Sequence, residues 1–195
     1  TLGLSSKTIV IFTSDNGGLA TREGANTPAT INAPLREGKG WLYEGGVRVP
    51  LIVSWPGRTS PGVESSPCWS PDLFATIAEL GGAGEPSAQD GVSLAGLLKG
   101  GNLPPDRSLY WHYPHYSNQG GRPGGAVRAG DWKLIEDYET RRRELFNVKK
   151  DPSESRNLAV AEPQKVEELA AKLDGWRKAV DAQMPTPNPE YSPNA

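Results

Sequence analysis

The sequence predicts an α/β fold in two parts: a mixed or parallel sheet with helices, then a small antiparallel four-stranded sheet with a packed C-terminal helix. Three observations lead to this prediction. An apolar, β-branched run near the start ends in a polar turn, four short strand-like runs follow residue 107, and a long amphipathic segment comes near the end. We expect the first part to cover residues 1–104 and the second to cover residues 105–195.

The composition excludes several classes of protein. The 195 residues include 21 basic and 23 acidic side chains, a formal net charge of −2. A broad basic surface for nucleic acid or an anionic membrane is therefore not expected. No apolar run approaches the roughly 20 residues that span a bilayer. The single cysteine, Cys68, excludes an internal disulfide and a thiolate-built zinc site. The oligomeric state stays open.

Apolar runs define the elements of the first part. Residues 8–13 form a continuous β-branched run, which is typical of a parallel strand buried on both faces. A second apolar run covers residues 49–55. Apolar side chains at helical spacing predict a helix over residues 72–80, because two glycines follow as a stop. A shorter amphipathic turn is expected over residues 92–98.

The second part begins with four short runs separated by turns, which predict an antiparallel sheet. These runs cover residues 109–113, 126–129, 132–136 and 144–148. A helix is predicted from about Pro163 to Ala182, because apolar residues recur at steps of three and four. Its apolar stripe should pack on the sheet. The proline-rich tail from about residue 184 is expected to be loose.

A carboxylate and a side-chain amide stand together where the first strand ends, in Ser14-Asp15-Asn16-Gly17-Gly18. The oxygens of Asp15 and Asn16 are the hard donors that Ca²⁺ or Mg²⁺ prefers. Neighbouring side chains of a regular strand point to opposite faces, so both reach one ion only where the strand breaks, and the glycines allow that break. The alternative is an Asn-Gly turn in which Asp15 caps a backbone N–H.

Lys39 stands between two glycines in a later loop. A phosphate-binding P-loop is excluded, because Ala33 stands where its first glycine belongs and Gly40 where Ser or Thr belongs. A lysine in this setting can extend into a cleft and pair with a tetrahedral oxyanion. The alternative is a solvated loop lysine. Further along, Arg48 is expected to form a structural ion pair with Glu44.

The two histidines, His112 and His115, lie in the aromatic-rich run over residues 111–116. Such a strand end can line a sugar subsite, because aromatic rings stack on sugar faces and imidazoles bond to hydroxyls. The alternative is a core strand with partly satisfied histidines. Glu23, in the long loop after the Asp-Asn pair, is a further candidate for a substrate contact.

The segments Ser14–Gly18 and Pro34–Pro50 together resemble the sulfatase family, part of the alkaline phosphatase-like superfamily. Later stretches resemble the family in the same order. Residues 72–77 resemble its helix after the second strand, and residues 126–135 with 144–158 resemble its C-terminal subdomain. The resemblance covers nearly the whole chain, and it implies that the first part is the end of an alkaline phosphatase-like sheet.

The resemblance also implies a function: hydrolysis of a sulfate ester, of a carbohydrate in the commonest case. Asp15 and Asn16 match two of the family's four calcium ligands, with Mg²⁺ as an alternative ion, and Lys39 matches a lysine that holds the substrate sulfate. In the family, a formylglycine hydrate attacks sulfur, the alcohol leaves and the sulfated hemiacetal collapses. A periplasmic or secreted location is common in the family. His112 and His115 would then contact substrate.

The chain departs from the family's pattern at the nucleophile. In the family, formylglycine arises from the first residue of a Cys/Ser-x-Pro/Ala-x-Arg motif, which an Asp-Asp metal pair precedes. We interpret the chain as having neither this motif nor the Asp-Asp pair, because Cys68 begins a stretch with the wrong order, after the Asp-Asn pair instead of before it. We therefore expect a missing N-terminal segment to carry the nucleophile, and the chain to be inactive alone.

Two other functions stay open. One is a truncated or degenerate homologue that folds, and binds a sulfated glycan, without catalysis. The other is a phosphodiesterase or phosphomutase of the same superfamily. The second is less favoured, because those sites usually bring histidines to two transition metals and no histidine neighbours Asp15.

Overall fold

The structure is a computed structural model that describes residues 2–84 and 90–192. The chain forms two compact units, which are described one at a time. The first unit comprises the residues up to 14 with residues 50–109, and the second comprises residues 15–49 with those from 110 onward. The expected domain boundary between residues 104 and 105 stays a prediction. No helix of the described residues is both long and apolar enough to cross a membrane.

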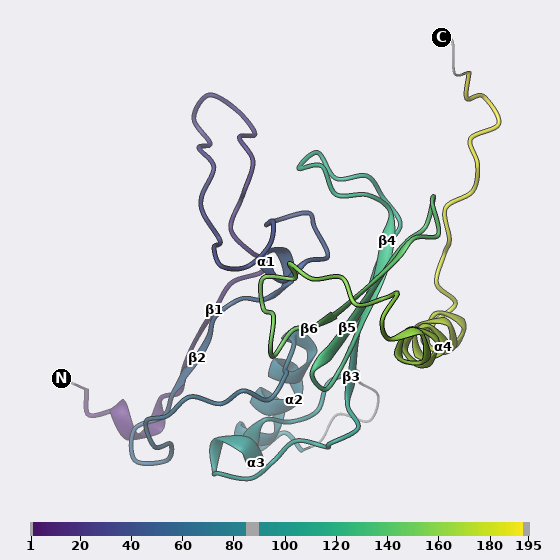
Figure 1. Cartoon of the computed structure of the whole chain (residues 1–195). Coiled ribbons are helices and arrows are strands. Elements are labelled where there is room, and N and C mark those ends of the chain that lie inside the picture. The colour runs from purple at the N-terminus through teal and green to yellow at the C-terminus, as the bar shows by residue number, and fades with distance from the viewer. Residues whose placement is uncertain (1, 85–89, 193–195) are drawn as a thin grey trace. The chain divides into compact units, whose positions relative to one another are not determined.

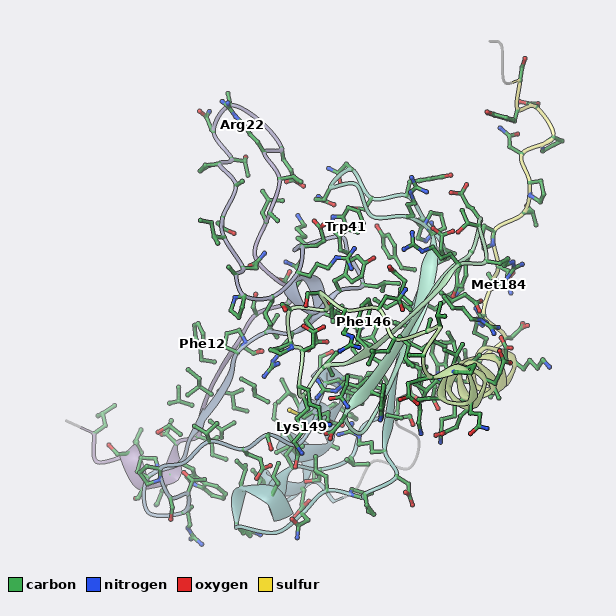
Figure 2. The ribbon with its side chains drawn as sticks, viewed as in Figure 1. Phe12, Arg22, Trp41, Phe146, Lys149 and Met184 are labelled. Atoms are coloured by element: carbon green, nitrogen blue, oxygen red, sulfur yellow. The ribbon has the colours of Figure 1, made fainter. Side chains whose placement is uncertain are left out.

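The first unit contains a two-stranded ribbon of β1 (Val10–Thr13) and β2 (Leu51–Ser54), which lie side by side in Figure 1. The expectation of a buried parallel strand over residues 8–13 is wrong, because β1 pairs antiparallel with β2. Val10 and Phe12 are 57% and 60% exposed, and Figure 2 labels Phe12. Apolar side chains occupy both faces of the ribbon, but the described residues leave one face uncovered.

Helix α2 (Ser70–Leu80) confirms the helix predicted over residues 72–80 and begins two residues earlier. Asp72 explains the early start. Its fully buried carboxylate accepts the backbone N–H of Trp69 at 2.9 Å, which satisfies a donor at the helix N-terminus. The same carboxylate forms an ion pair with Arg107 at 2.5 Å. The other helical elements of this unit are short: η1 (Ser5–Lys7) and α3 (Ala95–Leu98).

The second unit is built on a four-stranded sheet in the order β3-β4-β5-β6, which confirms the predicted antiparallel sheet. The strands are β3 (Ser108–Tyr113), β4 (Gly124–Ala129), β5 (Trp132–Asp137) and β6 (Arg143–Asn147). Helix α4 (Pro163–Ala179) lies against this sheet (Figure 1). It ends three residues before the predicted end at Ala182, because Asp181 adopts a left-handed conformation with φ of 48°.

Alternate residues of the strands point to opposite faces and build two separate cores. On one face, sheet residues such as Leu134 pack against the apolar stripe of α4, which includes Leu169 and Leu173. On the other face, Ile135 and Phe146 belong to a core on which side chains of another segment pack. Those side chains are Leu42 and Tyr43, and Trp111 of β3 packs there as well. The second core therefore supports the loop that carries Lys39.

Candidate functional site

Asp15 and Asn16 form a turn directly after the end of β1. Asp15 is exposed, and its Oδ1 accepts the backbone N–H of Asn16 at 3.0 Å. The side-chain amide of Asn16 donates to the carbonyl of Gly17 at 3.0 Å. The capping contact expected of an Asn-Gly turn is therefore present. It occupies one carboxylate oxygen of Asp15 with a single N–H and leaves acceptor capacity on that side chain.

Two backbone hydrogen bonds fasten the Asp15-Asn16 turn to the loop of Lys39. Gly17 N–H donates to the carbonyl of Gly46 at 2.9 Å, and Lys39 N–H donates to the carbonyl of Gly18 at 3.1 Å. The approach requires glycine, because a Cβ at position 17 would collide with the carbonyl oxygen of Gly45. The fold thus fastens the segment of the predicted metal ligands to the segment that carries the predicted sulfate-binding lysine.

The ammonium group of Lys39 lies beside a carboxylate. Its Nζ is 3.8 Å from Oε1 of Glu23, and the two side chains are 43% and 24% exposed. Glu23 also accepts hydrogen bonds from the side-chain amides of Gln119 and Asn118. Glu23, which the sequence marked as a possible substrate contact, is therefore positioned next to the lysine. Lys39 is half-exposed and accessible to an anion.

A buried charge cluster anchors the other end of this loop, at α1 (Glu44–Val47). Lys133 of β5 is fully buried, and its Nζ lies 2.9 Å from Oε1 of Glu44 and 3.0 Å from Oε1 of Glu154. Glu154 also accepts the backbone N–H of Glu44 at 2.6 Å. Burial raises the pKa of Glu154, and the charge of Lys133 partly offsets that rise.

Part of this cluster was predicted and part was not. The expected ion pair between Arg48 and Glu44 is present, at 3.8 Å. The sequence patterns did not indicate that Lys133 and Glu154 belong to the cluster. A lysine in a short strand is normally assigned to the solvent face. The burial of Lys133 could have been inferred from its position beside Leu134 and Ile135, in the most apolar part of β5.

The two histidines differ in their surroundings. His112 of β3 has both ring nitrogens engaged: Nδ1 lies 2.6 Å from the Tyr138 hydroxyl and Nε2 lies 2.9 Å from the carbonyl of Gln183. His115 is exposed, and its ring lies edge-on to Tyr113, with centroids 5.5 Å apart. A substrate contact stays a prediction for both residues. His115 has the accessible ring.

The donor chemistry of Asp15 and Asn16 fits part of a calcium site. Ca²⁺ takes about six to eight oxygen ligands, which include carboxylates and amide carbonyls. Among the described residues, 2–84 and 90–192, no group of three or more His, Cys, Asp or Glu side chains is placed to hold a metal ion. The two side chains therefore supply a fraction of the coordination shell, and the other ligands would come from water or from further protein groups.

Our interpretation that the chain lacks the short nucleophile motif is wrong, because one stretch of the chain matches it. Ser54-Trp55-Pro56-Gly57-Arg58 has the Ser-x-Pro-x-Arg pattern. Ser54 is the last residue of β2, and the following residues form a hydrogen-bonded turn. The stretch follows the Asp-Asn pair and no Asp-Asp pair precedes it, so we do not assign the nucleophile to Ser54.

Comparison with known proteins gives one family match. The family described as N-sulphoglucosamine sulphohydrolase, C-terminal, matches residues 38–181. The matched range contains Lys39, the sheet from β4 to β6 and helix α4.

Two curated relatives are similar in sequence. A protein named Sulfatase from Formosa agariphila is 36% identical over 191 residues, which cover 91% of this chain and 33% of the relative. Arylsulfatase A from Homo sapiens is 43% identical over 133 residues, which cover 68% of this chain and 25% of the relative. The chain thus spans a quarter to a third of the length of these relatives.

A solved structure resembles the chain as well. A protein in complex with its substrate D-glucosamine-2-N,6-O-disulfate matches with a TM-score of 0.70 and 28% identity, over 91% of this chain and 35% of that one. This likeness confirms the predicted α/β fold, in which part of an alkaline phosphatase-like sheet precedes the four-stranded subdomain.

Proposed function

The chain belongs to the sulfatase family, in the part that the N-sulphoglucosamine sulphohydrolase C-terminal domain represents, and on this premise we propose that it is the C-terminal portion of a sulfuric ester hydrolase. The observation that carries the proposal is the pair of backbone hydrogen bonds that joins two loops. Hydrogen bonds of Gly17 and Lys39 hold the Asp15-Asn16 turn against the Lys39 loop. Hard oxygen donors and an accessible ammonium on two segments fastened to each other suit a tetrahedral, anionic ester group.

Each residue of the cluster has a proposed role. Asp15 and Asn16 hold one side of a Ca²⁺ ion, or of Mg²⁺, whose positive charge stabilises the transferring sulfuryl group when it is bound. Lys39 donates charge-assisted hydrogen bonds to a sulfate oxygen and fixes the orientation of the ester. Glu23 lies beside the ammonium of Lys39 and holds it toward the cluster.

The nucleophile and the remaining metal ligands are proposed to lie outside the 195 residues. In the sulfatase reaction this nucleophile is a formylglycine. The residues described here would bind and orient the substrate and would not carry out the displacement. This assignment explains why a half-exposed lysine and an incomplete ligand set occur together.

A sulfated carbohydrate is the proposed substrate. The support is the relative in complex with D-glucosamine-2-N,6-O-disulfate, which is 28% identical to the chain. The aromatic and histidine-bearing segment after β3, with an exposed His115, supplies groups that bind sugars. A periplasmic or secreted location goes with this proposal.

The test begins with the intact mass of the protein from its source. A mass well above 20.9 kDa would identify the longer product, which is then assayed for sulfate release from an aryl sulfate and from glucosamine 6-sulfate. Release from either ester supports the proposal. A product of 20.9 kDa, or a longer one that releases no sulfate from either ester, would favour the degenerate, glycan-binding homologue.

A further inference from the structure

A cavity of about 280 Å³ lies beside the loop that carries Lys39. Residues of the second unit alone line it: the loop over residues 40–43, the segment over residues 121–124 that leads into β4, and side chains from the ends of β5 and β6. Ligand sites for small molecules usually measure roughly 300–1,000 Å³. The cavity lies just below this range, so it suits a ligand no larger than one sugar-sized group.

The acidic side chains in the cavity wall are already paired. Glu136 forms an ion pair with Arg177 at 3.1 Å. Glu144 accepts the hydroxyl of Tyr43 at 2.5 Å, and burial together with this bond raises the pKa of Tyr43, so the hydroxyl keeps its proton. Asp137 accepts two backbone N–H groups of the turn after β5. None of the three carboxylates is left without a partner.

Within the part of the chain that the structure describes, two arginines of the wall form no ion pair with a carboxylate. Arg122 is exposed and forms neither an ion pair nor a hydrogen bond with any residue in the described part of the chain. Arg36 lies over the ring of Tyr43, 3.8 Å from its centroid, and donates to the carbonyl of Glu154 at 3.3 Å. Neither contact neutralises the guanidinium charge of Arg36. Among the described charged groups of the wall, Arg36, Arg122 and Asp137 form no ion pair, and the charge of Arg122 is one of the causes that lower the pKa of Asp137. Two positive charges against one negative charge leave the cavity with an excess of positive charge.

Aromatic rings form the apolar part of the wall. The rings of Trp41 and Tyr43 are stacked, with centroids 6.0 Å apart and planes inclined by 29°. The indole N–H of Trp41, which Figure 2 labels, donates to the carbonyl of Gln119 at 3.0 Å and so fixes the ring. Aromatic walls with a few fixed polar groups are typical of small-molecule sites. Combined with arginines, they suit a sugar ring that carries an anionic group.

We propose that this cavity binds an anionic sugar residue, sulfated or carboxylated, next to the residue whose sulfate Lys39 holds. The inference rests on the proposed function and extends it to a second position of the glycan. Gly40 lies in the cavity wall and follows Lys39 directly, so the wall begins one residue along the chain from the lysine. Arg122 binds the anionic group, and Trp41 packs against the sugar ring.

The test is a titration of the full chain, followed through the indole N–H signals of its six tryptophans by NMR. The chain carries Lys39→Ala, which removes the sulfate contact of the proposed reaction site, so the outcome does not depend on turnover. The probes are glucose 6-sulfate, glucuronate and glucose. We expect at least one anionic sugar to shift the Trp41 signal saturably, and glucose to bind at least tenfold more weakly. The Trp41→Phe variant assigns the signal.

A matched pair of variants tests the role of Arg122. Arg122→Gln should weaken binding of the anionic sugar about tenfold, the usual loss for one charge-assisted hydrogen bond. Arg156→Gln is the control, because Arg156 is an exposed arginine outside the cavity. The better of the two anionic probes identifies the group as sulfate or carboxylate. Equal affinities in both variants, equal binding of glucose, or an unshifted Trp41 signal would overturn the proposal, even if the protein proves to be a sulfatase.

Discussion

The ammonium of Lys133 lies 2.9 Å from a carboxylate oxygen of Glu44, and both side chains are removed from solvent. Lys133 belongs to strand β5 of the four-stranded sheet, whereas Glu44 begins the short helix α1 at the end of the Lys39 loop. Glu154 completes the cluster at 3.0 Å from the same ammonium. The loop that carries Lys39 is thus held to the sheet by buried ion pairs as well as by apolar packing.

Removing the cation from this cluster should destabilise the protein strongly. Lys133→Met leaves two buried carboxylates without their shared partner, and breaking a buried pair in this way costs about 3–5 kcal/mol. The double variant Lys133→Met with Glu154→Gln should recover part of the loss. Urea denaturation measures both. Lys149→Met, at an exposed lysine, is the control; a loss below about 1 kcal/mol for Lys133→Met would contradict the buried cluster.

The raised pKa of Glu154 predicts a specific pH dependence of stability. The folded state binds the Glu154 proton more tightly than the unfolded state does. Its contribution is therefore most favourable below the ordinary pKa of glutamate, and it declines as pH rises through the interval up to the raised pKa. Glu154→Gln should remove this decline. Denaturation curves from pH 4 to 8 test it, and parallel curves for wild type and variant would show that the pKa is not raised.

The periodic elements were predictable from sequence, and the charge cluster was not. Strands β4 to β6 and helix α4 were found because each buries one regular row of apolar side chains, such as Leu134 and Leu169. The exposure of β1 was missed, since apolar content alone does not say which faces are covered. Lys133 meets Glu44 from 89 residues away. Local sequence patterns contain no information on such long-range contacts. The short motif around Asp15 does predict a local feature, the turn that Asp15 and Asn16 form.

Metal binding at the strand end is tested by changing Asp15 and Asn16 one at a time. In the product with its complete catalytic domain, Asp15→Ala or Asn16→Ala should weaken Ca²⁺ binding by tenfold or more, since each variant removes an oxygen ligand. Calorimetry measures the affinity. Asp106→Ala, at an exposed aspartate of the other unit, is the control. Unchanged affinity in both site variants would remove these residues from the ligand set.

The two histidines should respond differently to substitution. His115 is exposed, so His115→Ala should lower kcat/KM for a sulfated sugar several-fold and leave turnover of a small aryl sulfate nearly unchanged. His112 bonds to Tyr138 and to the carbonyl of Gln183, so His112→Ala should chiefly lower the melting temperature. An equal loss on both substrates for His115→Ala would refute a sugar-binding role.

Lys39 gives the sharpest test of the site, because its role is separable from that of Glu23. Lys39→Ala should lower kcat/KM for an aryl sulfate by about ten- to a hundredfold, since a hydrogen bond from a charged donor contributes roughly 1.5–3 kcal/mol. Lys39→Arg should keep part of the activity. Glu23→Gln leaves the ammonium in place beside an uncharged side chain, so it should affect turnover less than Lys39→Ala. Lys99→Ala, at an exposed lysine of the other unit, is the control. Wild-type kinetics for Lys39→Ala would exclude the lysine from the reaction site and leave the Asp15-Asn16 turn as its only supported part.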